Sequence, residues 1–427
     1  MIMKIPERSP PVSAITETDS VSISPEILRY AKEFNSRYLH WDDLRYRELG
    51  GYDRSDIWRI MKILRVLTYH YVDIGDYGVS YSLVNEYVRD ALHQIDVRLL
   101  TGPIASATGS DRRGAMLSVS SVMEESIASS QLEGASTTTV LAKKLLREGK
   151  PPKDRSERMI VNNYAAMQLI KERIDEPLSP GLIKEIHRTV TDGLMDDPST
   201  SGEFRKDDSV AVRGITEDVT YHVPVEHGLI DSMVEALCRY ANDDRERGHP
   251  VIKGIILHYL LAYIHPFLDG NGRVSRALFY WYCLRYGYPT MGYLSVSRAI
   301  KEHRQGYSMA FLYSETDGDD ITYFIRFNLK MILESLDAFE SYLKRKGEEQ
   351  SETEDSFAGY GLSSRQLQIL RDLIDSRTPM SQYELSEKYQ TPVPTIRRDL
   401  MKLIDAGLVK PSMKDGHRQL YVYSGTH

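Results

Sequence analysis

Residues 265–276, which read HPFLDGNGRVSR, constrain the fold of this chain more than any other segment. They lie between two strongly apolar stretches, 251–264 and 277–286, which predict helices buried on every face. Because Pro266 disfavours helical backbone at the preceding residue, we expect the first helix to end at His265. The sequence therefore predicts a polar loop held between two core helices, which is a suitable place for a rigid active site.

The backbone of this loop is suited to an anion. Gly270 and Gly272 let backbone N–H groups converge without interference from a Cβ atom. The second helix begins near Gly272, so its N-terminal N–H groups and its dipole point into the same space. Arg273 and Arg276 lie three residues apart on one helix face, and guanidinium groups match phosphate oxygens.

Two further side chains complete a chemical site. Asp269 is a hard oxygen ligand of the kind that Mg²⁺ takes together with phosphate oxygens. His265 is the one group of the loop whose ordinary pKa lets it accept a proton near neutral pH. An anion site, two arginines, a carboxylate and a base together predict phosphoryl or nucleotidyl transfer.

The loop resembles the signature of the Fic family, HPFx(D/E)GNGRxxR, at every defined position. A dinucleotide-binding fingerprint is the nearest alternative, but no strand precedes the loop and Ser275 stands where the third glycine belongs. The resemblance implies a mainly α fold, a Fic-type helical bundle. It also implies ATP as substrate and roles for these residues: His265 as base, Asp269 as the Mg²⁺ ligand, and Gly270, Asn271, Gly272, Arg273 and Arg276 on the phosphates.

An upstream helix resembles the inhibitory helix of the family. Residues 115–132 have apolar side chains at helical spacing, and the helix ends in Ser129-Ser130-Gln131-Leu132-Glu133-Gly134, which is similar to the pattern (S/T)xxxE(G/N). The resemblance implies that Glu133 occupies Arg276, which a γ-phosphate would otherwise contact. Ser129 lies one turn earlier on the same face. Read alone, Glu133 would be a solvated residue before a C-cap glycine.

Two other segments are assigned by resemblance. Residues 210–225 have strand character and correspond to the family's β-hairpin flap, which holds the target by main-chain pairing; its residues here are Tyr221, His222, Val223 and Pro224. Tyr307, in a helix predicted over 297–314, resembles a tyrosine that lines the adenine pocket, and is equally compatible with the core. Where relatives often carry a nucleotide-contacting Asn, this chain has Ser314-Glu315.

Composition limits the remaining possibilities. The 427 residues carry a formal net charge of −7, which argues against polyanion binding by the whole chain. The two cysteines, Cys238 and Cys283, lie in apolar helical patterns without metal spacing and indicate a reduced, cytoplasmic protein. The apolar runs are too short to span a membrane, and the N-terminus has no signal-peptide pattern.

The pattern along the chain predicts six parts. They are a disordered tail (1–25), an N-terminal helical domain (26–112), the inhibitory helix and its connection (113–150), the Fic catalytic domain (151–345), an acidic linker (346–361) and a winged-helix domain (362–427). Within the second part we expect helices over 55–71 and 81–100. Residues 347–356 contain five acidic and no apolar side chains.

The C-terminal part resembles a winged helix-turn-helix. Three short helices precede an alternating hairpin, and residues 363–427 contain ten Lys and Arg against seven Asp and Glu, a net charge of +3. Thr395, Arg397, Arg398 and Lys402 are the candidates for DNA contacts. Protein binding is the alternative for such a domain.

Together these features predict a protein adenylyltransferase that transfers AMP from ATP to a Ser, Thr or Tyr hydroxyl of a target protein. A family branch that transfers the γ-phosphoryl group has Lys in place of Gly272, so the glycine favours AMP transfer. Two alternatives stay open: a hydrolase that removes AMP at the same site, and a DNA-binding regulator modulated by its Fic domain. Family members are often dimers, so a homodimer is possible.

Overall fold

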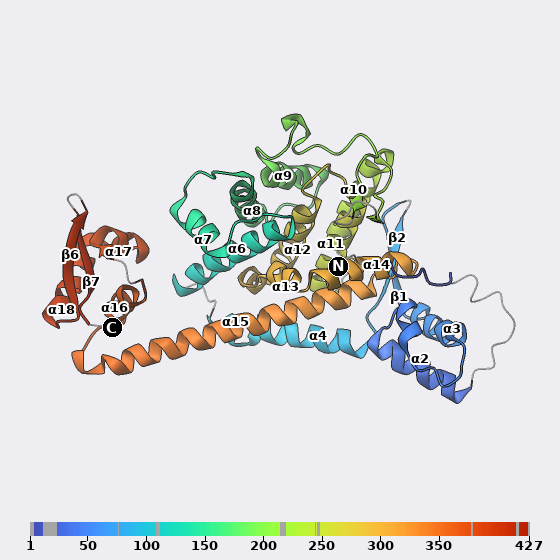
Figure 1. Cartoon of the computed structure of the whole chain (residues 1–427), viewed down its shortest axis with the longest axis horizontal. Helices are drawn as coiled ribbons and strands as arrows, with labels where there is room; N and C mark the ends of the chain where they lie inside the picture. The colour runs from blue at the N-terminus through green and yellow to red at the C-terminus, as the bar shows by residue number, and fades with distance from the viewer. Residues whose placement is uncertain are drawn as a thin grey trace. The chain divides into compact units, whose positions relative to one another are not determined.

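The computed structural model describes residues 4–11, 24–75, 77–107, 112–213, 219–243, 245, 248–376, 379–415 and 418–425 (Figure 1). The chain divides into two compact units, residues 1–340 and 341–427. Helices dominate both units and the sheets are small and antiparallel, which confirms the predicted mainly α class. Among the described residues, no helix is both long and apolar enough to cross a membrane.

The N-terminal part of the first unit begins with a capped helix. The Ser24 side chain accepts from the N–H of Ile27, and Pro25 occupies the first helical position of α2. Its elements are α2 (Pro25–Arg37), η1 (Asp42–Tyr46), α3 (Arg54–Val66), β1 (Tyr69–Asp73), β2 (Gly78–Ser82), α4 (Glu86–Asp96), η2 (Val97–Thr101) and α5 (Pro103–Ala107).

The β1–β2 hairpin corrects our expectation of helices over 55–71 and 81–100. α3 ends at Val66 and α4 begins only at Glu86; between them β1 and β2 pair in antiparallel register from Tyr69 with Ser82 to Asp73 with Gly78. The segments Tyr-His-Tyr-Val and Val-Ser-Tyr are rich in aromatic and β-branched residues, which fit a pleated surface better than a helix.

Part of the predicted disordered tail is held in place. Residues 1–3 and 12–23 lie outside the described residues, but Ser9 is buried and makes two hydrogen bonds. Its N–H donates to the carbonyl of Thr316 at 2.8 Å, and its hydroxyl donates to Asp317 Oδ1 at 2.7 Å. Polar contacts with a distant loop therefore order 4–11, although the segment lacks an apolar pattern.

A buried ionic cluster joins α3 to the loop that precedes α15. Lys62 Nζ lies 2.8 Å from Asp317 Oδ1, and Arg65 Nη1 lies 3.4 Å from Asp317 Oδ2. Asp320 accepts from the hydroxyls of Tyr38 and Tyr69 at 2.7 and 2.6 Å. All four charged side chains are almost completely buried, so loss of one partner would leave an uncompensated charge.

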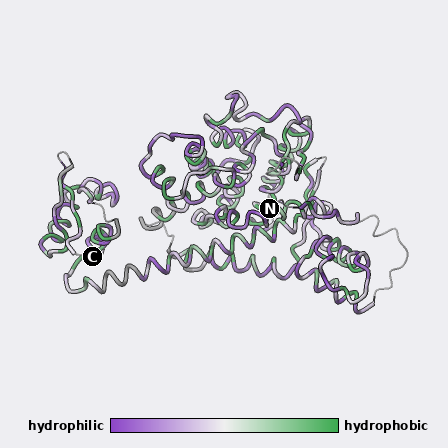
Figure 2. Tube along the Cα trace, in the orientation of Figure 1, coloured by the Kyte–Doolittle hydropathy of each residue, from purple (hydrophilic) through white to green (hydrophobic). Residues whose placement is uncertain are grey.

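The middle of the first unit is a cluster of helices around two buried ones. α11 and α12 are almost entirely buried, as their continuous apolar sequence predicts, and they pack against each other. Figure 2 shows the hydrophobic residues concentrated in this region. The helices are α6 (Arg112–Leu132), α7 (Thr139–Glu148), α8 (Arg155–Glu172), α9 (Pro180–Thr191), η3 (Pro198–Thr200), η4 (His227–Leu229), α10 (Ile230–Asn242), α11 (Pro250–Ile264) and α12 (Asn271–Arg285).

The remaining elements of this unit are a short hairpin and the helices after α12. The hairpin consists of β3 (Val212–Arg213) and β4 (Thr220–His222); residues 214–218 are not among those described. The single helix predicted over 297–314 is divided at His303. The elements after α12 are η5 (Pro289–Tyr293), α13 (Val296–Glu302), α14 (Arg304–Thr316) and α15 (Thr322–Ser356).

The predicted acidic linker is largely helical. α15 continues to Ser356 because Glu, Gln and Lys are good helix formers even without an apolar face to bury. In the second unit follow η6 (Ala358–Tyr360), α16 (Ser364–Ser376), β5 (Met380–Ser381), α17 (Gln382–Lys388), α18 (Val393–Asp405), β6 (Val409–Asp415) and β7 (Arg418–Tyr423). The strand order is β5-β7-β6.

The second unit has its own core. Apolar side chains of α16, α17 and α18 meet those of β6, among them Ile369, Leu385, Ile396 and Val409. The order of three helices followed by a hairpin agrees with the order expected for residues 362–427, and the winged-helix assignment stays a prediction. On α18, Arg397, Arg398 and Lys402 are exposed and Thr395 is half-buried.

Candidate active site

The polar loop between α11 and α12 is fixed by its own backbone. α11 ends at His265, which has left-handed backbone (φ 52°), and its N–H donates to the carbonyl of Leu261 at 3.0 Å. Gly270, with φ 84°, precedes the first residue of α12. Asn271 closes the loop with its side chain, which accepts from the N–H of Phe267 at 3.0 Å and donates to the carbonyl of Phe267 at 2.8 Å.

The closed loop changes the role expected for Asn271. Its side chain is buried and both of its polar atoms are engaged by Phe267, so a nucleotide could contact only the backbone of this residue. Gly272 differs, because it lies at the start of α12 and is part of a pocket wall. The first N–H groups of α12 have no partner within the helix and are available to an anion.

His187 of α9 contacts the loop at Asp269 and Phe267. Sequence patterns did not predict this role. The Nδ1 atom of His187 accepts from the N–H of Gly202 at 2.8 Å, so its Nε2 carries the proton and donates to the carbonyl of Asp269 at 2.9 Å. The ring stacks on Phe267 with 3.7 Å between ring centroids. Burial lowers the pKa of His187 to about 4, which keeps this tautomer neutral.

His265 is oriented as a base. Its Nδ1 lies 3.1 Å from the carbonyl of Ala262, and because a carbonyl can only accept, Nδ1 carries the proton. The lone pair is therefore on Nε2. Burial lowers the pKa of His265 to about 4, so the imidazole is neutral throughout the neutral pH range.

Arg205 also fixes the backbone at His265. It is buried, its Nε donates to the carbonyl of His265 at 3.0 Å, and its N–H donates to the carbonyl of Pro266 at 2.8 Å. The same guanidinium donates to the carbonyl of Val225, just beyond β4, and to Asp208 Oδ1 at 2.8 Å. Arg205 thus ties the catalytic loop to the chain that follows the hairpin.

Arg273 has unused hydrogen-bonding capacity. Nη1 donates to the carbonyl of Val190 at 2.8 Å, whereas the buried Nε and Nη2 have no hydrogen-bond partner. The nearest carboxylate oxygen, Asp269 Oδ2, lies 3.6 Å from Nη2. A buried cation with unpaired N–H groups fits an anionic ligand that completes its contacts.

Asp269 stands at the rim of the site. Its Oδ1 accepts from the N–H of Gly270 at 2.6 Å, Oδ2 lies 3.5 Å from Arg155 Nη2, and the side chain is 46% exposed. Across the described residues, no group of three or more His, Cys, Asp or Glu side chains could hold a metal ion. Asp269 therefore offers one protein oxygen, which fits Mg²⁺ that arrives with phosphate and water ligands.

Arg276 is already occupied by the end of α6. Its Nη2 donates to Glu133 Oε1 at 2.7 Å and to the carbonyl of Ser129 at 3.1 Å, and its Nε donates to Ser129 Oγ at 2.9 Å. Burial alone would raise the pKa of Glu133, but the Arg276 guanidinium outweighs burial and holds that pKa below its usual range. Glu133 is therefore a carboxylate in an ion pair.

Glu133 lies directly over the start of α12. A Cβ atom added to Gly272 would overlap the Glu133 carboxylate, so the glycine leaves the space that this carboxylate fills. Gly134, with φ 98°, ends the helix, and the N–H of Ala135 donates to the carbonyl of Ser130 at 3.0 Å in a C-terminal cap.

Glu125, two turns before Glu133, anchors α6, and it too was missed from the sequence. The carboxylate is 2% exposed and accepts from the hydroxyl of Tyr280 and the N–H of Ser297, both at 2.9 Å. The Ser297 and Ser295 hydroxyls also donate to it. These donors compensate a buried charge and attach α6 to α12 and to the start of α13.

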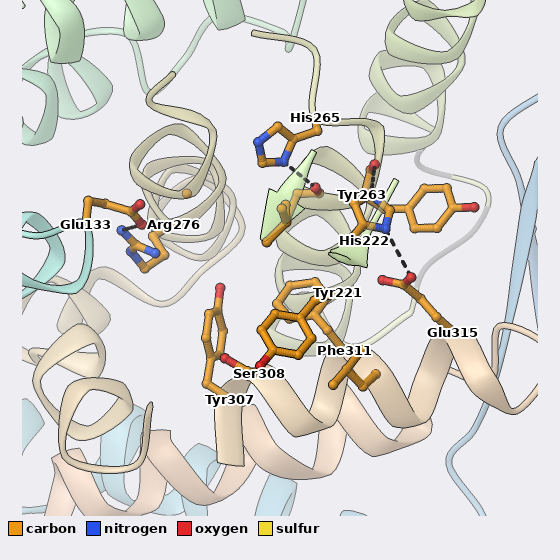
Figure 3. A pocket seen from close by; sticks show the side chains of 14 residues that line it. Glu133, Tyr221, His222, Tyr263, His265, Arg276, Tyr307, Ser308, Phe311 and Glu315 are labelled. Carbon is orange, nitrogen blue, oxygen red and sulfur yellow. Dashed lines mark hydrogen bonds and ion pairs between the residues drawn. The ribbon is translucent and has the colours of Figure 1, made fainter. Parts of the chain in front are cut away.

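Half of the predicted site residues line one pocket (Figure 3). Glu133 and Arg276 line one side, and the hairpin residues Tyr221 and His222 and the α14 residue Glu315 line another. The remaining lining residues are Val212, Ala262, Tyr263, His265, Gly272, Tyr307, Ser308, Phe311 and Leu312. Of the other residues expected at the site, Ser129, Asp269, Gly270, Asn271, Arg273, Val223 and Pro224 do not line this pocket.

Tyr307 lies in the pocket wall rather than in the core. Its hydroxyl is 2.8 Å from His258 Nε2, and burial raises the pKa of Tyr307 to about 12, so it is a neutral hydrogen-bonding side chain. Ser314, in contrast, points into its own helix and donates to the carbonyl of Ala310 at 2.9 Å. At the position where relatives of this sequence pattern carry Asn, only Glu315 reaches the pocket.

The pocket geometry and the loop sequence agree with a known family. Residues 177–283, which include α9, α11, the loop that follows it and most of α12, match the Fic/DOC family. The chain carries a Fic domain. His187, Arg205, His265 and Arg276 all lie within it.

Curated relatives match a longer stretch than the Fic domain alone. The protein adenylyltransferase Fic of Drosophila grimshawi is 31% identical over 208 residues, which are 48% of this chain and 39% of that protein. The protein of the same name in Drosophila ananassae is 30% identical over 208 residues and is covered to 38%. The chain thus spans about two-fifths of the length of these relatives.

Solved structures share the fold beyond the Fic domain. A Fic family protein from Desulfovibrio desulfuricans has a TM-score of 0.53 and 19% identity, with 79% of this chain and 95% of that chain covered. A Fic-1 fragment from C. elegans has a TM-score of 0.53 and 17% identity, with 75% and 88% covered. At these identities the likeness concerns the fold alone.

Proposed function

We propose that this chain is a protein adenylyltransferase that transfers AMP from ATP to a Ser, Thr or Tyr hydroxyl of a target protein. The observation that carries the proposal is the arrangement of His265, whose lone pair on Nε2 lies in the same pocket as Arg276 and the N-terminus of α12. A base and an anion site in one pocket suit the attack of a hydroxyl on a phosphate. The Drosophila relatives named protein adenylyltransferase Fic support this reaction type.

In the proposed reaction, Nε2 of His265 takes the proton of the target hydroxyl while its oxygen forms a bond to the α-phosphorus. The bond between the α-phosphorus and the bridging oxygen breaks, pyrophosphate leaves, and AMP remains on the target. The first N–H groups of α12, the unpaired N–H groups of Arg273 and the guanidinium of Arg276 stabilise the negative charge. Asp269 would hold Mg²⁺, which neutralises phosphate charge when bound.

The same contacts support an autoinhibited resting state. Glu133 fills the space over Gly272 and takes up the Nη2 of Arg276, which the phosphates would need. A polyphosphate and the Glu133 carboxylate are both anions and compete for one cation. The Ser129 hydroxyl and carbonyl hold the rest of the guanidinium and fix its orientation.

The test is incubation of cell lysate with ATP labelled on the α-phosphate and with wild type, Glu133→Gly or His265→Ala protein. Label on protein mainly with Glu133→Gly, and none with His265→Ala, is the expected result. A wild type that equals Glu133→Gly would remove the inhibitory role of Glu133. Release of AMP from a previously modified target that depends on Glu133 would instead favour the hydrolase.

A second proposal concerns DNA binding by the second unit. Arg397, Arg398 and Lys402 are exposed along α18, and the buried Asp399 between them accepts from Arg365 and Gln366 of α16, which fixes the rotation of the helix. The expected result is DNA affinity that falls steeply with salt and is reduced in Arg397→Ala. An affinity that does not change with salt would contradict this proposal.

A further inference from the structure

His222 of β4 makes two hydrogen-bond contacts across the pocket. Its Nδ1 lies 3.0 Å from Glu315 Oε2 on α14, and its Nε2 lies 2.8 Å from the carbonyl oxygen of Tyr263 at the end of α11 (Figure 3). The imidazole is thus placed between two oxygens that come from different helices. Tyr263 is two residues before His265, so the contact reaches the catalytic loop.

Both oxygens that His222 contacts are hydrogen-bond acceptors, so both of its ring nitrogens must carry a proton. A carbonyl oxygen and a carboxylate oxygen both accept, whereas a neutral imidazole has a single N–H group. Either neutral tautomer would direct a nitrogen lone pair at an oxygen within 3.0 Å. The doubly protonated imidazolium satisfies both contacts and also forms an ion pair with Glu315.

The hairpin needs such a side-chain attachment. β3 has two residues and β4 has three, and the pairing register shifts between Val212 and Arg213. A two-stranded hairpin of this length is not stable by itself in water. Its position against the pocket therefore depends on side chains that hold it to neighbouring helices, and His222 contacts two of them.

We propose that His222 is a positioning residue that fastens the hairpin across the pocket only while its imidazole is protonated. The inference rests on the proposed function for its catalytic consequence, because the hairpin borders the space where nucleotide and target hydroxyl would meet. Loss of the proton removes the bond to Glu315 or to Tyr263 and frees the hairpin. His222 thereby makes substrate binding depend on pH, without contact with the reacting atoms.

The charges around His222 come from every neighbouring element. Glu315 of α14 is in direct contact, and Asp319 of the following loop is bound by the hydroxyl of Tyr77, from the β1–β2 hairpin, at 2.9 Å. Burial raises the pKa of Asp319 to about 6, so this carboxyl also titrates in the tested range. The ring of His265 lies 6.5 Å from that of His222, and the His222 charge helps burial to lower the pKa of His265.

Glu315→Gln tests whether the contact between residue 315 and His222 needs a protonated imidazole. A glutamine amide can donate to Nδ1 of a neutral imidazole, while Nε2–H still donates to the Tyr263 carbonyl. The variant should therefore stay fastened at every pH. His222→Ala removes both contacts and should be loose at every pH. Asp319 is retained in both variants, but Glu315 raises its pKa and His222 lowers it, so its titration shifts in each of them.

The experiment is hydrogen–deuterium exchange of the backbone amides of residues 219–223 and 225 in the full chain at pH 6.0 and 8.5, corrected for intrinsic exchange. Wild type should lose about tenfold protection at the higher pH, which corresponds to loss of one charge-assisted hydrogen bond. Glu315→Gln should be protected at both pH values and His222→Ala at neither. His227→Gln, which alters another histidine–carboxylate pair (His227 Nδ1 to Asp208 Oδ2, 2.9 Å), should retain the wild-type difference.

Equal protection of wild type at both pH values, or the same loss in Glu315→Gln as in wild type, would overturn the proposal. Thermal unfolding at both pH values shows that each variant is folded. In a Glu133→Gly background, KM for ATP should rise with pH when Glu315 is present and stay level in Glu315→Gln. Absence of AMP transfer in every variant would refute the proposed function, while the exchange data would still decide the role of His222.

Discussion

Replacement of Glu133 by two different residues tests the proposed inhibition of the resting state and measures its strength. Glu133→Gly removes the whole side chain, and Glu133→Gln keeps its shape and one acceptor oxygen for Arg276 Nη2, which lies 2.7 Å from Oε1. The glutamine therefore removes only the charge. If Glu133 competes with the phosphates for Arg276, AMP transfer should increase in the order wild type, Gln, Gly.

The size of the increase follows from the contact. The Arg276 side chain is 4% exposed and the Glu133 side chain is 31% exposed, so the ion pair is only partly accessible to solvent. A hydrogen bond between charged groups contributes about 1.5–3 kcal/mol and a neutral one about 1 kcal/mol. Glycine should thus raise transfer about 10- to 150-fold, and glutamine about 2- to 30-fold.

The assay is the initial rate of α-phosphate label incorporation at subsaturating ATP, together with ATP affinity by calorimetry. Glu124→Gln serves as a matched control, because Glu124 lies on the same helix but pairs with Lys143 and Arg298 instead of Arg276. A glutamine variant as active as the glycine variant would show that charge alone decides inhibition. Activation by Glu124→Gln, or none by either Glu133 variant, would refute the competition for Arg276.

Three further predictions follow from buried groups. Arg205→Ala in the Glu133→Gly background should lower kcat at least tenfold, because the carbonyls of His265 and Val225 lose a common hydrogen-bond donor. An unchanged kcat would show that neither contact matters. In the same background, kcat at saturating ATP should stay constant from pH 8 to about 5 and fall near pH 4, where His265 becomes protonated; a midpoint near 6.5 would contradict the pKa shift. Burial lowers the pKa values of His40 and His187 to about 3 and about 4. Below pH 6.5 the unfolded chain therefore binds more protons than the folded chain. The free energy of unfolding, measured with denaturant, should fall by about 1.4 kcal/mol per pH unit for each histidine down to pH 4.

Sequence patterns located the parts of the site that consist of consecutive residues. The loop from His265 to Arg276 contains its own helix ends, glycines and charges, so local patterns were sufficient to place it between two buried helices. Glu133 was located through a short pattern at a helix end. The mainly α class followed from amphipathic and apolar periodicity, and the structure confirms it.

The residues that were missed act over long distances in the sequence. His187 contacts Asp269 across 82 positions, Arg205 contacts His265 across 60, and Glu125 contacts Ser297 across 172. Each is an ordinary polar residue within its own segment, so no local pattern distinguishes it. The β1–β2 hairpin was missed for a different reason, because its aromatic residues also fit one face of a helix.

If Glu133 inhibits transfer as proposed, the anchoring of α6 at Glu125 limits how that inhibition can be relieved. Because that carboxylate is buried among four donors, we expect the body of the helix to stay attached while its last turn, from Ser129 to Glu133, opens locally. The open population then depends on a local equilibrium of about 1.5–3 kcal/mol, or about one molecule in 10 to one in 150. Under the proposed inhibition we expect a measurable basal turnover, and a partner that binds only the opened turn should activate transfer in proportion to its own concentration.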